Sequence, residues 1–261
     1  MLLLLAIDSP HGADSAPLRR AFVGSTILTL ALPARVRTVA PVPHPNVPLD
    51  SSTASFVLIE DDPLLLDLFV VALNLQFKPA KLQTFTHGRA GIEFCRQEKP
   101  SLAILDLGLP DMDGRAVIRS LLTASPDTRV IVLTGQSSST LPGELISLGV
   151  SGYIDKGSPL ESMHAAVKRV LEGGIYFSAG IRPARFGGMV GNAPELPPET
   201  LTPREMEIAR LVASGLISKE IAERLKLSPR TVEKARSAIL TKLNLRDLPG
   251  LVRWCMTHGL V

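Results

Sequence analysis

Three carboxylates, one hydroxyl and one amine lie in the sequence at the ends of short apolar runs. They are Glu60, Asp61, Asp106, Thr134 and Lys156. Short apolar runs bounded by Gly, Pro and polar residues are typical of buried strands of a parallel sheet. The carboxyl ends of such strands share one edge, where open α/β sheets bind their ligands, so we expect the five side chains to converge there.

This set of groups is suited to phosphoryl transfer. Asp106 would be the nucleophile, while Thr134 and Lys156 would bind phosphate oxygens. The hard oxygens of Glu60 and Asp61 suit Mg²⁺, which takes few protein ligands. Each residue also has an ordinary explanation, such as acids stabilising a helix N-terminus. The coincidence of five such groups at matching strand ends favours the phosphoryl-transfer site.

The elements that must position these groups alternate along the chain. Strands are predicted over residues 56–59, 81–85, 102–105, 129–133 and 152–154. Helices are predicted over residues 64–75, 88–97, 115–122, 141–148 and 159–171. Strands that alternate with helices over a single domain imply an α/β fold with a parallel sheet covered on both faces.

Residues 55–172 resemble the receiver domain of two-component response regulators. The resemblance is carried by VLIEDDP (57–63), LDLGLPDMDG (105–114), VLTG (132–135) and GYIDK (152–156). It implies a doubly wound, five-stranded parallel sheet and a phosphoryl group that Asp106 takes from a sensor histidine kinase. It also implies Mg²⁺ bound by Glu60, Asp61, Asp106 and the carbonyl of Gly108. Many relatives carry Asp where this chain has Glu60, which keeps the ligand type.

By the same resemblance, Tyr153 is the aromatic switch whose ring moves when Thr134 engages the phosphate. Plain core packing is the alternative for Tyr153. A rival motif is Asp111-Met-Asp113, which looks like the signature of haloacid-dehalogenase-type phosphohydrolases. That signature needs a strand directly before its first Asp, whereas Pro110 favours a loop, so we interpret Asp111 and Asp113 as turn acids.

The C-terminal residues predict short helices over 203–213, 218–225, 229–243 and 247–256. Thr202 and Glu205 form a capping-box pattern at the first helix, and Ser218 is expected to cap the second. Short helices joined by tight turns fit a small all-α domain with a helix-turn-helix. Residues 226–246 hold six basic side chains against one acid, Glu233, which indicates phosphate contacts with nucleic acid.

This region resembles the LuxR-type domain of NarL/FixJ response regulators through LTPRE (201–205), KEIA (219–222), SPRTVE (228–233) and KL (242–243). The resemblance implies that the helix from Pro229 enters the major groove. The residues that would contact the DNA backbone are Lys219, Arg230, Thr231 and Lys242. Those that would face bases are Glu233, Lys234 and either Ser237 or Arg236. Ala235 and Ala238 depart from the polar residues common in relatives, which leaves the recognition code open.

The remaining segments are predicted to connect or extend these domains. Residues 1–54 are expected to be a poorly ordered extension, with a targeting segment as the alternative, because residues 21–34 look superficially like a signal-peptide core. Residues 173–198 are rich in Gly and Pro and predict a flexible linker to a domain over 199–261. Two distant cysteines, Cys95 and Cys255, give no disulfide framework, which suits a reducing cytoplasm and no membrane partner.

These features together predict a response regulator transcription factor rather than an enzyme. Its partners would be a sensor histidine kinase, promoter DNA and, on activation, a second copy that pairs through the last helix; plain core packing of that helix is the alternative. A regulator that binds DNA without phosphorylation and uses its first domain to dimerise also fits. A phosphatase-like enzyme is a further alternative, and a quorum-sensing LuxR relative is disfavoured by the acid pocket.

Overall fold

The computed structural model describes residues 48–136, 138, 140–178 and 200–261. Most of the predicted extension and most of the predicted linker therefore lie outside the described residues. Residues 48–54, which we expected to end the extension, contact the first domain. The N–H of Leu49 donates to the carbonyl of Leu171 at 2.8 Å, and Ala54 is buried.

The first domain is built on one parallel sheet, with strand order β2-β1-β3-β4-β5-β6. The strands are β1 (Ser55–Ile59), β2 (Lys81–Phe85), β3 (Leu102–Leu105), β4 (Arg129–Thr134), β5 (Gly152–Asp155) and β6 (Tyr176–Phe177). β1, β3 and β4 are buried along nearly their whole length, as their unbroken apolar runs predict. The strand order reverses between β1 and β3, which is the switch point where such sheets bind ligands.

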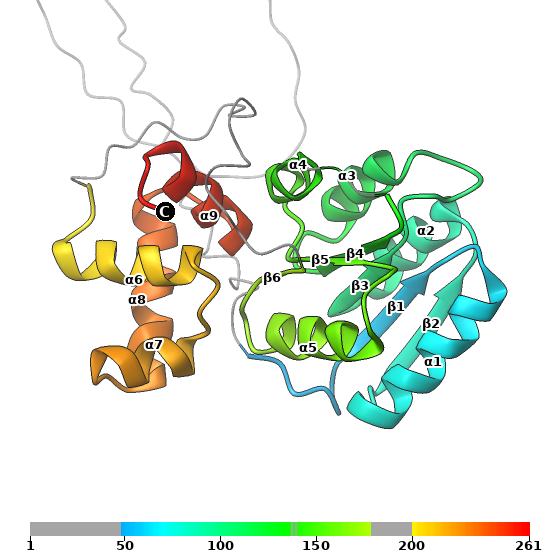
Figure 1. The fold of residues 1–261 in the computed structure, drawn as a ribbon, viewed down its shortest axis with the longest axis horizontal. Helices are drawn as coiled ribbons and strands as arrows, with labels where there is room; N and C mark the ends of the chain where they lie inside the picture. Colours follow the sequence, from blue (N-terminus) through cyan, green and yellow to red (C-terminus); the bar gives the residue numbers. More distant parts are fainter. Residues whose placement is uncertain (1–47, 137, 139, 179–199) are drawn as a thin grey trace, which may run out of the picture. The chain divides into compact units, whose positions relative to one another are not determined.

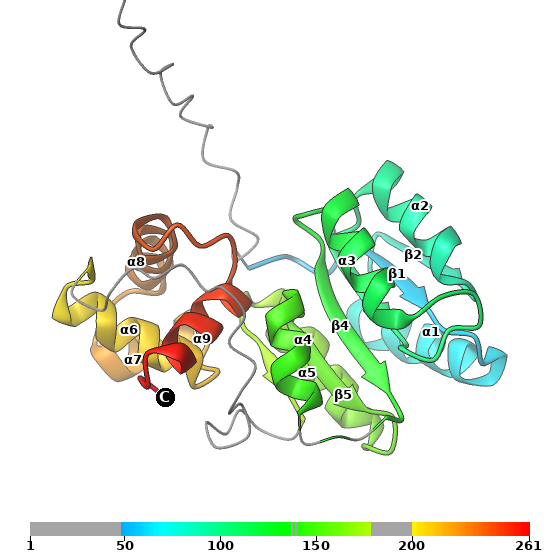
Figure 2. The same cartoon turned by 90° about the horizontal axis from the view of Figure 1, so that it is seen from above.

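Helices cover both faces of this sheet. They are α1 (Pro63–Phe77), α2 (Gly88–Glu98), α3 (Gly114–Ala124), α4 (Leu141–Leu148) and α5 (Leu160–Leu171). α1 and α5 lie on one face, and α2, α3 and α4 lie on the other (Figures 1 and 2). Each face has its own apolar core, with Phe69 and Val167 on the first and Ile92 and Leu145 on the second. The predicted doubly wound α/β fold is confirmed.

In the part of the chain that the structure describes, β6 is the one strand beyond the five that we predicted. Tyr176 and Phe177 pair in parallel with Gly152 and Tyr153 at the edge of the sheet. Their apolar side chains pack on the domain because the strand follows α5 after a short turn at Gly173, whose φ is +74°. The start of the predicted linker is therefore part of the sheet.

The C-terminal domain is all-helical, as predicted. Its helices are α6 (Pro203–Ala213), α7 (Ser218–Leu225), α8 (Pro229–Lys242) and α9 (Leu248–Thr257). Thr202 and Glu205 form the predicted capping box at α6. The buried side of α8 is made by Val232, Ile239 and Leu240, which recur at helical spacing. α7 and α8 are joined by a turn in which Lys226 has a φ of +54°, which completes the helix-turn-helix.

The expected capping role of Ser218 is wrong. The cap position of α7 is Ile217, and Ser218 is the first helical residue and is buried. Its hydroxyl accepts a hydrogen bond from Arg236 at 2.6 Å instead of holding the helix N-terminus. Among the described residues, no helix is long and apolar enough to cross a bilayer.

Gly114 is expected to be essential to the packing of α3 on the loop after β3. A Cβ at this position would lie 2.5 Å from the backbone Cα of Leu107, so the loop would have to shift. We expect Gly114→Ala to lower the free energy of unfolding by about 1–3 kcal/mol in urea titrations followed by circular dichroism. Gly135→Ala is the control, because a Cβ there meets nothing within 4 Å. Equal stability of the two variants would contradict this packing.

Candidate functional site

The predicted acids meet an ammonium group at the carboxyl edge of the sheet. Lys156 Nζ lies 2.8 Å from Glu60 Oε1 and 3.0 Å from Asp106 Oδ2. β1 and β3 are paired so that Ile59 lies opposite Leu105, which sets Glu60 and Asp106 side by side at the strand ends. Both carboxylates are nearly buried, with side chains 1% and 8% exposed. One cation therefore neutralises two acids that are largely removed from water.

The electrostatics of this pair follow from burial and contact. Burial raises the pKa of Glu60, although the hydrogen bond and the charge of Lys156 oppose the rise. For Lys156, burial lowers the pKa, but the hydrogen bonds to Glu60 and Asp106 outweigh it, and the pKa is raised overall. Lys156 therefore remains charged, and it holds the two carboxylates together.

A cation site adjoins this ion pair. Glu60, Asp61 and Asp106 can each offer a carboxylate oxygen, and the three oxygens lie within 4.8 Å of one another. The second oxygen of Glu60, Oε2, is buried without a hydrogen-bond partner. A buried, unpartnered carboxylate oxygen is costly unless a cation or donor satisfies it. These residues therefore fit a hard divalent cation, with Asp61 on the exposed side.

The other predicted groups lie around this pocket. Thr134 is buried at the end of β4, where its hydroxyl accepts the N–H of Gln136 at 3.2 Å and its carbonyl accepts the N–H of Lys156. Gly108 lies against the central acid, since a Cβ there would be 3.1 Å from Asp106 Oδ2. The space beside Thr134 is open at Gly135. Lys156 therefore links the two groups, since its ammonium contacts Asp106 and its N–H donates to the carbonyl of Thr134.

Tyr153 lies in the apolar core rather than at the surface. It is 4% exposed, and its ring centroid lies 6.4 Å from that of Phe177 on β6. Burial, and then the charge of Asp155, raises the pKa of its hydroxyl. Core packing accounts for Tyr153 in this conformation, and a switching movement stays a prediction.

Asp111 and Asp113 have the structural roles that we predicted for turn acids. Asp111 accepts hydrogen bonds from the N–H groups of Gly88 and Arg89, at 2.8 and 3.0 Å. These N–H groups at the start of α2 are therefore paired with a carboxylate from the loop between β3 and α3. Asp113 is the N-cap of α3 and accepts the N–H of Arg115. Neither follows a strand directly, so the rival phosphohydrolase signature is absent at this position.

Most of the predicted DNA contacts are accessible to solvent in the helical domain. Those that are exposed are Lys219, Arg230, Thr231, Lys234 and Lys242, and those that are partly exposed are Glu233 and Ser237. Lys242 Nζ is held at 2.8 Å by Glu205 Oε2, which is also part of the capping box. The basic character of this surface suits a polyanion such as DNA.

Comparison with known proteins identifies both domains. Residues 56–168 match the model of the response regulator receiver domain, and residues 199–255 match that of the bacterial regulatory proteins of the luxR family. The transcriptional regulatory protein MctR of Rhizobium johnstonii is 31% identical over 214 residues, which cover 78% of this chain and 94% of MctR. The chain belongs to the response regulators. It is a transcription regulator with a receiver domain and a LuxR-type DNA-binding domain.

The match to another relative also covers nearly the whole length of that protein. The oxygen regulatory protein NreC of Staphylococcus carnosus is 30% identical over 78% of this chain and 98% of NreC. Among solved structures, one of RcsB from Salmonella typhimurium is similar to this chain. The match covers 80% of this chain and 100% of the RcsB chain, with 20% sequence identity and a TM-score of 0.47.

Arg236 of the response regulator is buried, unlike the other predicted DNA contacts. Its guanidinium donates to Ser218 Oγ at 2.6 Å and to the carbonyl of Gly173, and it is 2% exposed. Burial lowers its pKa to about 10, with the charge of Glu233 opposing the shift. In this conformation Arg236 is hydrogen-bonded to protein groups. Ser237 and Arg236 were the two alternatives for one predicted contact to a base, and of these only Ser237 is partly exposed.

Long-range contacts of Arg169 and Arg253 were not predicted from the sequence. Arg169 donates to the carbonyl of Gly215 at 2.7 and 2.9 Å and lies 2.8 Å from Glu220. Arg253 donates to the carbonyl of Ser147 at 2.8 Å. These partners are 46 to 106 residues apart. No local sequence pattern indicates such contacts, and the basic residues would otherwise be interpreted as a solvated surface.

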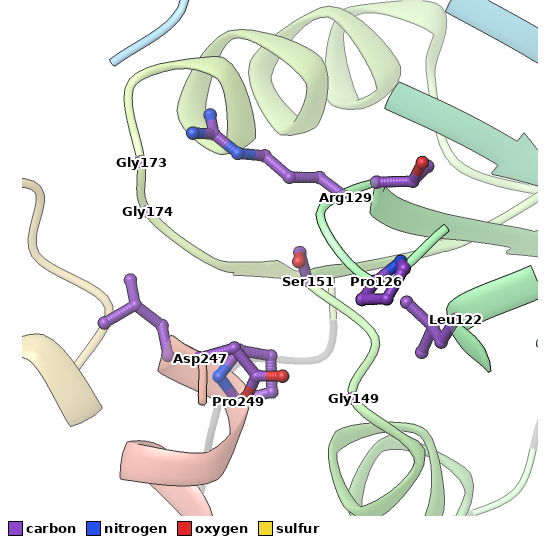
Figure 3. A pocket seen from close by; sticks show the side chains of 11 residues that line it. Leu122, Pro126, Arg129, Gly149, Ser151, Gly173, Gly174, Asp247 and Pro249 are labelled. Atoms are coloured by element: carbon purple, nitrogen blue, oxygen red, sulfur yellow. The ribbon is translucent and has the colours of Figure 1, made fainter. Parts of the chain in front are cut away.

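A cavity lined by both domains is too small to be a ligand site. It encloses about 20 Å³ and is lined by Arg129, Gly149, Ser151, Asp247 and neighbouring residues (Figure 3). That volume is near the limit for a single water molecule. This cavity therefore adds no candidate site to the acid pocket at the sheet edge.

The ion pair of Lys156 is expected to stabilise the receiver domain. Lys156→Met would leave two nearly buried carboxylates without their cation, so we expect the free energy of unfolding to fall by about 3 kcal/mol. Urea unfolding at neutral pH measures this loss. Adding Glu60→Gln to Lys156→Met should restore part of it, because one uncompensated charge is removed.

Lys81→Met is the matched control. Lys81 pairs with Glu98 at 2.8 Å, but both side chains are nearly half exposed. Its removal should change the free energy of unfolding by less than about 1 kcal/mol. Equal losses for the two lysines would show that Lys156 is no more than a surface ion pair.

Proposed function

We propose that this regulator is switched by a phosphoryl group on Asp106. The observation that carries the proposal is that Lys156 bridges Glu60 and Asp106 at the carboxyl edge of the sheet, next to a Glu60 oxygen that is buried without a partner. A carboxylate oxygen of Asp106 would attack the donor's phosphorus, the bond from phosphorus to the donor's imidazole nitrogen would break, and the nitrogen would keep that electron pair. The donor would be a sensor histidine kinase, as the receiver fold suggests.

The residues around Asp106 would each stabilise the acyl phosphate. Lys156 would move its ammonium from the carboxylates to a phosphoryl oxygen, and the hydroxyl of Thr134 would donate to another. Gly108 leaves room for that group and offers a carbonyl to the cation site. Glu60, Asp61 and Asp106 would hold Mg²⁺. When bound, Mg²⁺ would neutralise part of the charge that the acids share with the phosphoryl group.

The output would be binding of promoter DNA by α8. Lys219, Arg230, Thr231 and Lys242 would position the phosphate backbone. Glu233, Lys234 and Ser237 would face base edges in the major groove. The support is the exposure of the basic side chains on α8 and at its ends.

Arg236 suggests how the two events are coupled. It is held by the carbonyl of Gly173, which follows the last helix of the receiver domain. Burial, and then the charge of Arg236, lowers the pKa of Arg129 on β4 to about 10. Two buried guanidinium groups that repel one another make this contact easier to open. We infer that phosphorylation favours release of Arg236 toward DNA. Pairing of two copies through α9 would need the same opening, because its Leu248, Leu251 and Val252 are buried in this conformation, as the core-packing alternative predicts.

A regulator that binds DNA without phosphorylation is the second candidate. It is favoured by the accessibility of Arg230 and Lys234, which are exposed in this conformation. A normal promoter response in a strain carrying Asp106→Asn would support this candidate over the phosphorylated switch.

Asp106→Asn is expected to abolish labelling by acetyl phosphate. An amide nitrogen or oxygen at this position is too weak a nucleophile to form the acyl phosphate. Intact-mass spectrometry with Mg²⁺ and acetyl phosphate measures the added phosphoryl group. Asp113→Asn is the matched control and should label normally, because Asp113 is an exposed cap of α3. Label that persists in Asp106→Asn would overturn the site.

Lys234→Ala is expected to weaken DNA binding. Loss of one close contact to a base or phosphate should raise the dissociation constant about tenfold or more. Gel shifts with a sequence selected from random DNA by the full chain measure this change. Lys99→Gln, an exposed lysine of the receiver domain, is the control and should bind as the unaltered chain does. Equal affinities for Lys234→Ala and the control would exclude Lys234 from the DNA surface.

A further inference from the structure

The exposed side of α8 presents a methyl group among polar side chains. Ala238 is exposed, as are Lys234 one turn before it and Thr241 one turn after it. Residues three and four apart lie on the same side of a helix, so these three side chains form one row. Val232 and Ile239 are buried on the opposite side. Ala238 therefore lies in the middle of the side of α8 that faces away from the core.

The polar groups that follow Ala238 are already engaged within the protein. The hydroxyl of Thr241 donates to the carbonyl of Ser237 at 3.0 Å, and Lys242 Nζ lies 2.8 Å from Glu205 Oε2. These donors would have to leave their protein partners before they could hydrogen-bond a base edge. The methyl group of Ala238 neither donates nor accepts a hydrogen bond, so a contact that it makes with a base is an apolar one.

The major groove of DNA offers one apolar partner for such a side chain. Thymine carries its 5-methyl group there, whereas the groove edges of the other three bases are read through hydrogen bonds. Alanine is among the side chains that pack against this methyl group. Because its side chain is short, Ala238 also allows the backbone of α8 to approach the base edges closely.

We propose that Ala238 packs against the methyl group of a thymine and so determines part of the DNA sequence that the regulator selects. A helix rises about 1.5 Å per residue, which places Ala238 about 6 Å beyond Lys234 along α8. Base pairs are about 3.4 Å apart, so with α8 along the groove the thymine lies about two base pairs from the base that Lys234 faces. The inference rests on the proposed binding of promoter DNA by α8 and adds a specificity determinant to it.

Removal of the methyl group from the DNA tests the contact. The DNA is a sequence selected from random DNA by the full chain, and each of its thymines is replaced singly by deoxyuridine, which lacks the 5-methyl group. For the unaltered chain, we expect replacement at one position of the binding site to raise the dissociation constant about fourfold, the factor for one buried methyl group. Gel shifts with the full chain measure this ratio.

Removal of the methyl group from the protein completes the cycle. Ala238→Gly should bind the thymine and uracil forms of the DNA with equal affinity at that position, because the partner of the thymine methyl group is gone. Ala238→Asn provides a second measurement, since an asparagine amide pairs with adenine in the major groove. Sequence selection repeated with Ala238→Asn should no longer return thymine at that position.

Ala235→Gly is the matched control. It is the same change in the same helix and carries the same loss of helix propensity. Ala235 is partly buried and packs against the apolar core, so this variant should keep the preference for thymine over uracil. A loss of helix stability weakens binding to both DNAs alike, so the ratio of their dissociation constants reports the methyl contact and not the stability of α8.

Two results would overturn the inference. One is equal affinity of the unaltered chain for thymine and uracil at every position of the selected sequence. The other is a preference for thymine that Ala238→Gly retains, or that only Ala235→Gly removes, which would assign the methyl contact to another residue. Both results leave sequence selection by the full chain intact. Failure of that selection would refute the proposed DNA binding itself, and this inference with it.

Discussion

The ion pairs of Lys156 with Glu60 and Asp106 are the interaction on which the acid pocket of the receiver domain depends. Two nearly buried carboxylates lie side by side because β1 and β3 end together, and like charges removed from water are unstable without a cation. Lys156 supplies it from the end of β5. The same need for positive charge makes the pocket receptive to a divalent cation, since Glu60 retains a buried oxygen that Lys156 does not satisfy. The stability of the pocket and its proposed chemistry therefore have one cause.

Arg236 is the corresponding constraint in the DNA-binding domain. A guanidinium keeps its charge when buried, so its hydrogen bonds to Ser218 and Gly173 are what make its burial tolerable. Arg236, which the sequence offers as a DNA contact, is therefore hydrogen-bonded to groups of its own chain. The nearby Arg129 is buried as well, and the mutual repulsion of the two groups limits the stability of this contact. A contact of this kind suits the proposed switch between two conformations.

α1 combines three roles in one helix. Its inner face completes the core through residues such as Leu73, its N-terminus is capped by Asp62 beside the acid pocket, and its outer face is apolar.

The sequence alone determined the order of the elements, the strand ends that carry Glu60, Asp106 and Lys156, and the capping box at Thr202. These follow from local patterns, because apolar periodicity and helix caps depend on residues a few positions apart. Only the tertiary structure decided that Arg236 is buried, that Ser218 is its acceptor, and that β6 extends the sheet. It also decided that Leu64, Leu68, Val71 and Leu75 on the outer side of α1 are exposed with respect to the described residues. These features depend on contacts between residues far apart in the chain, which no local pattern encodes.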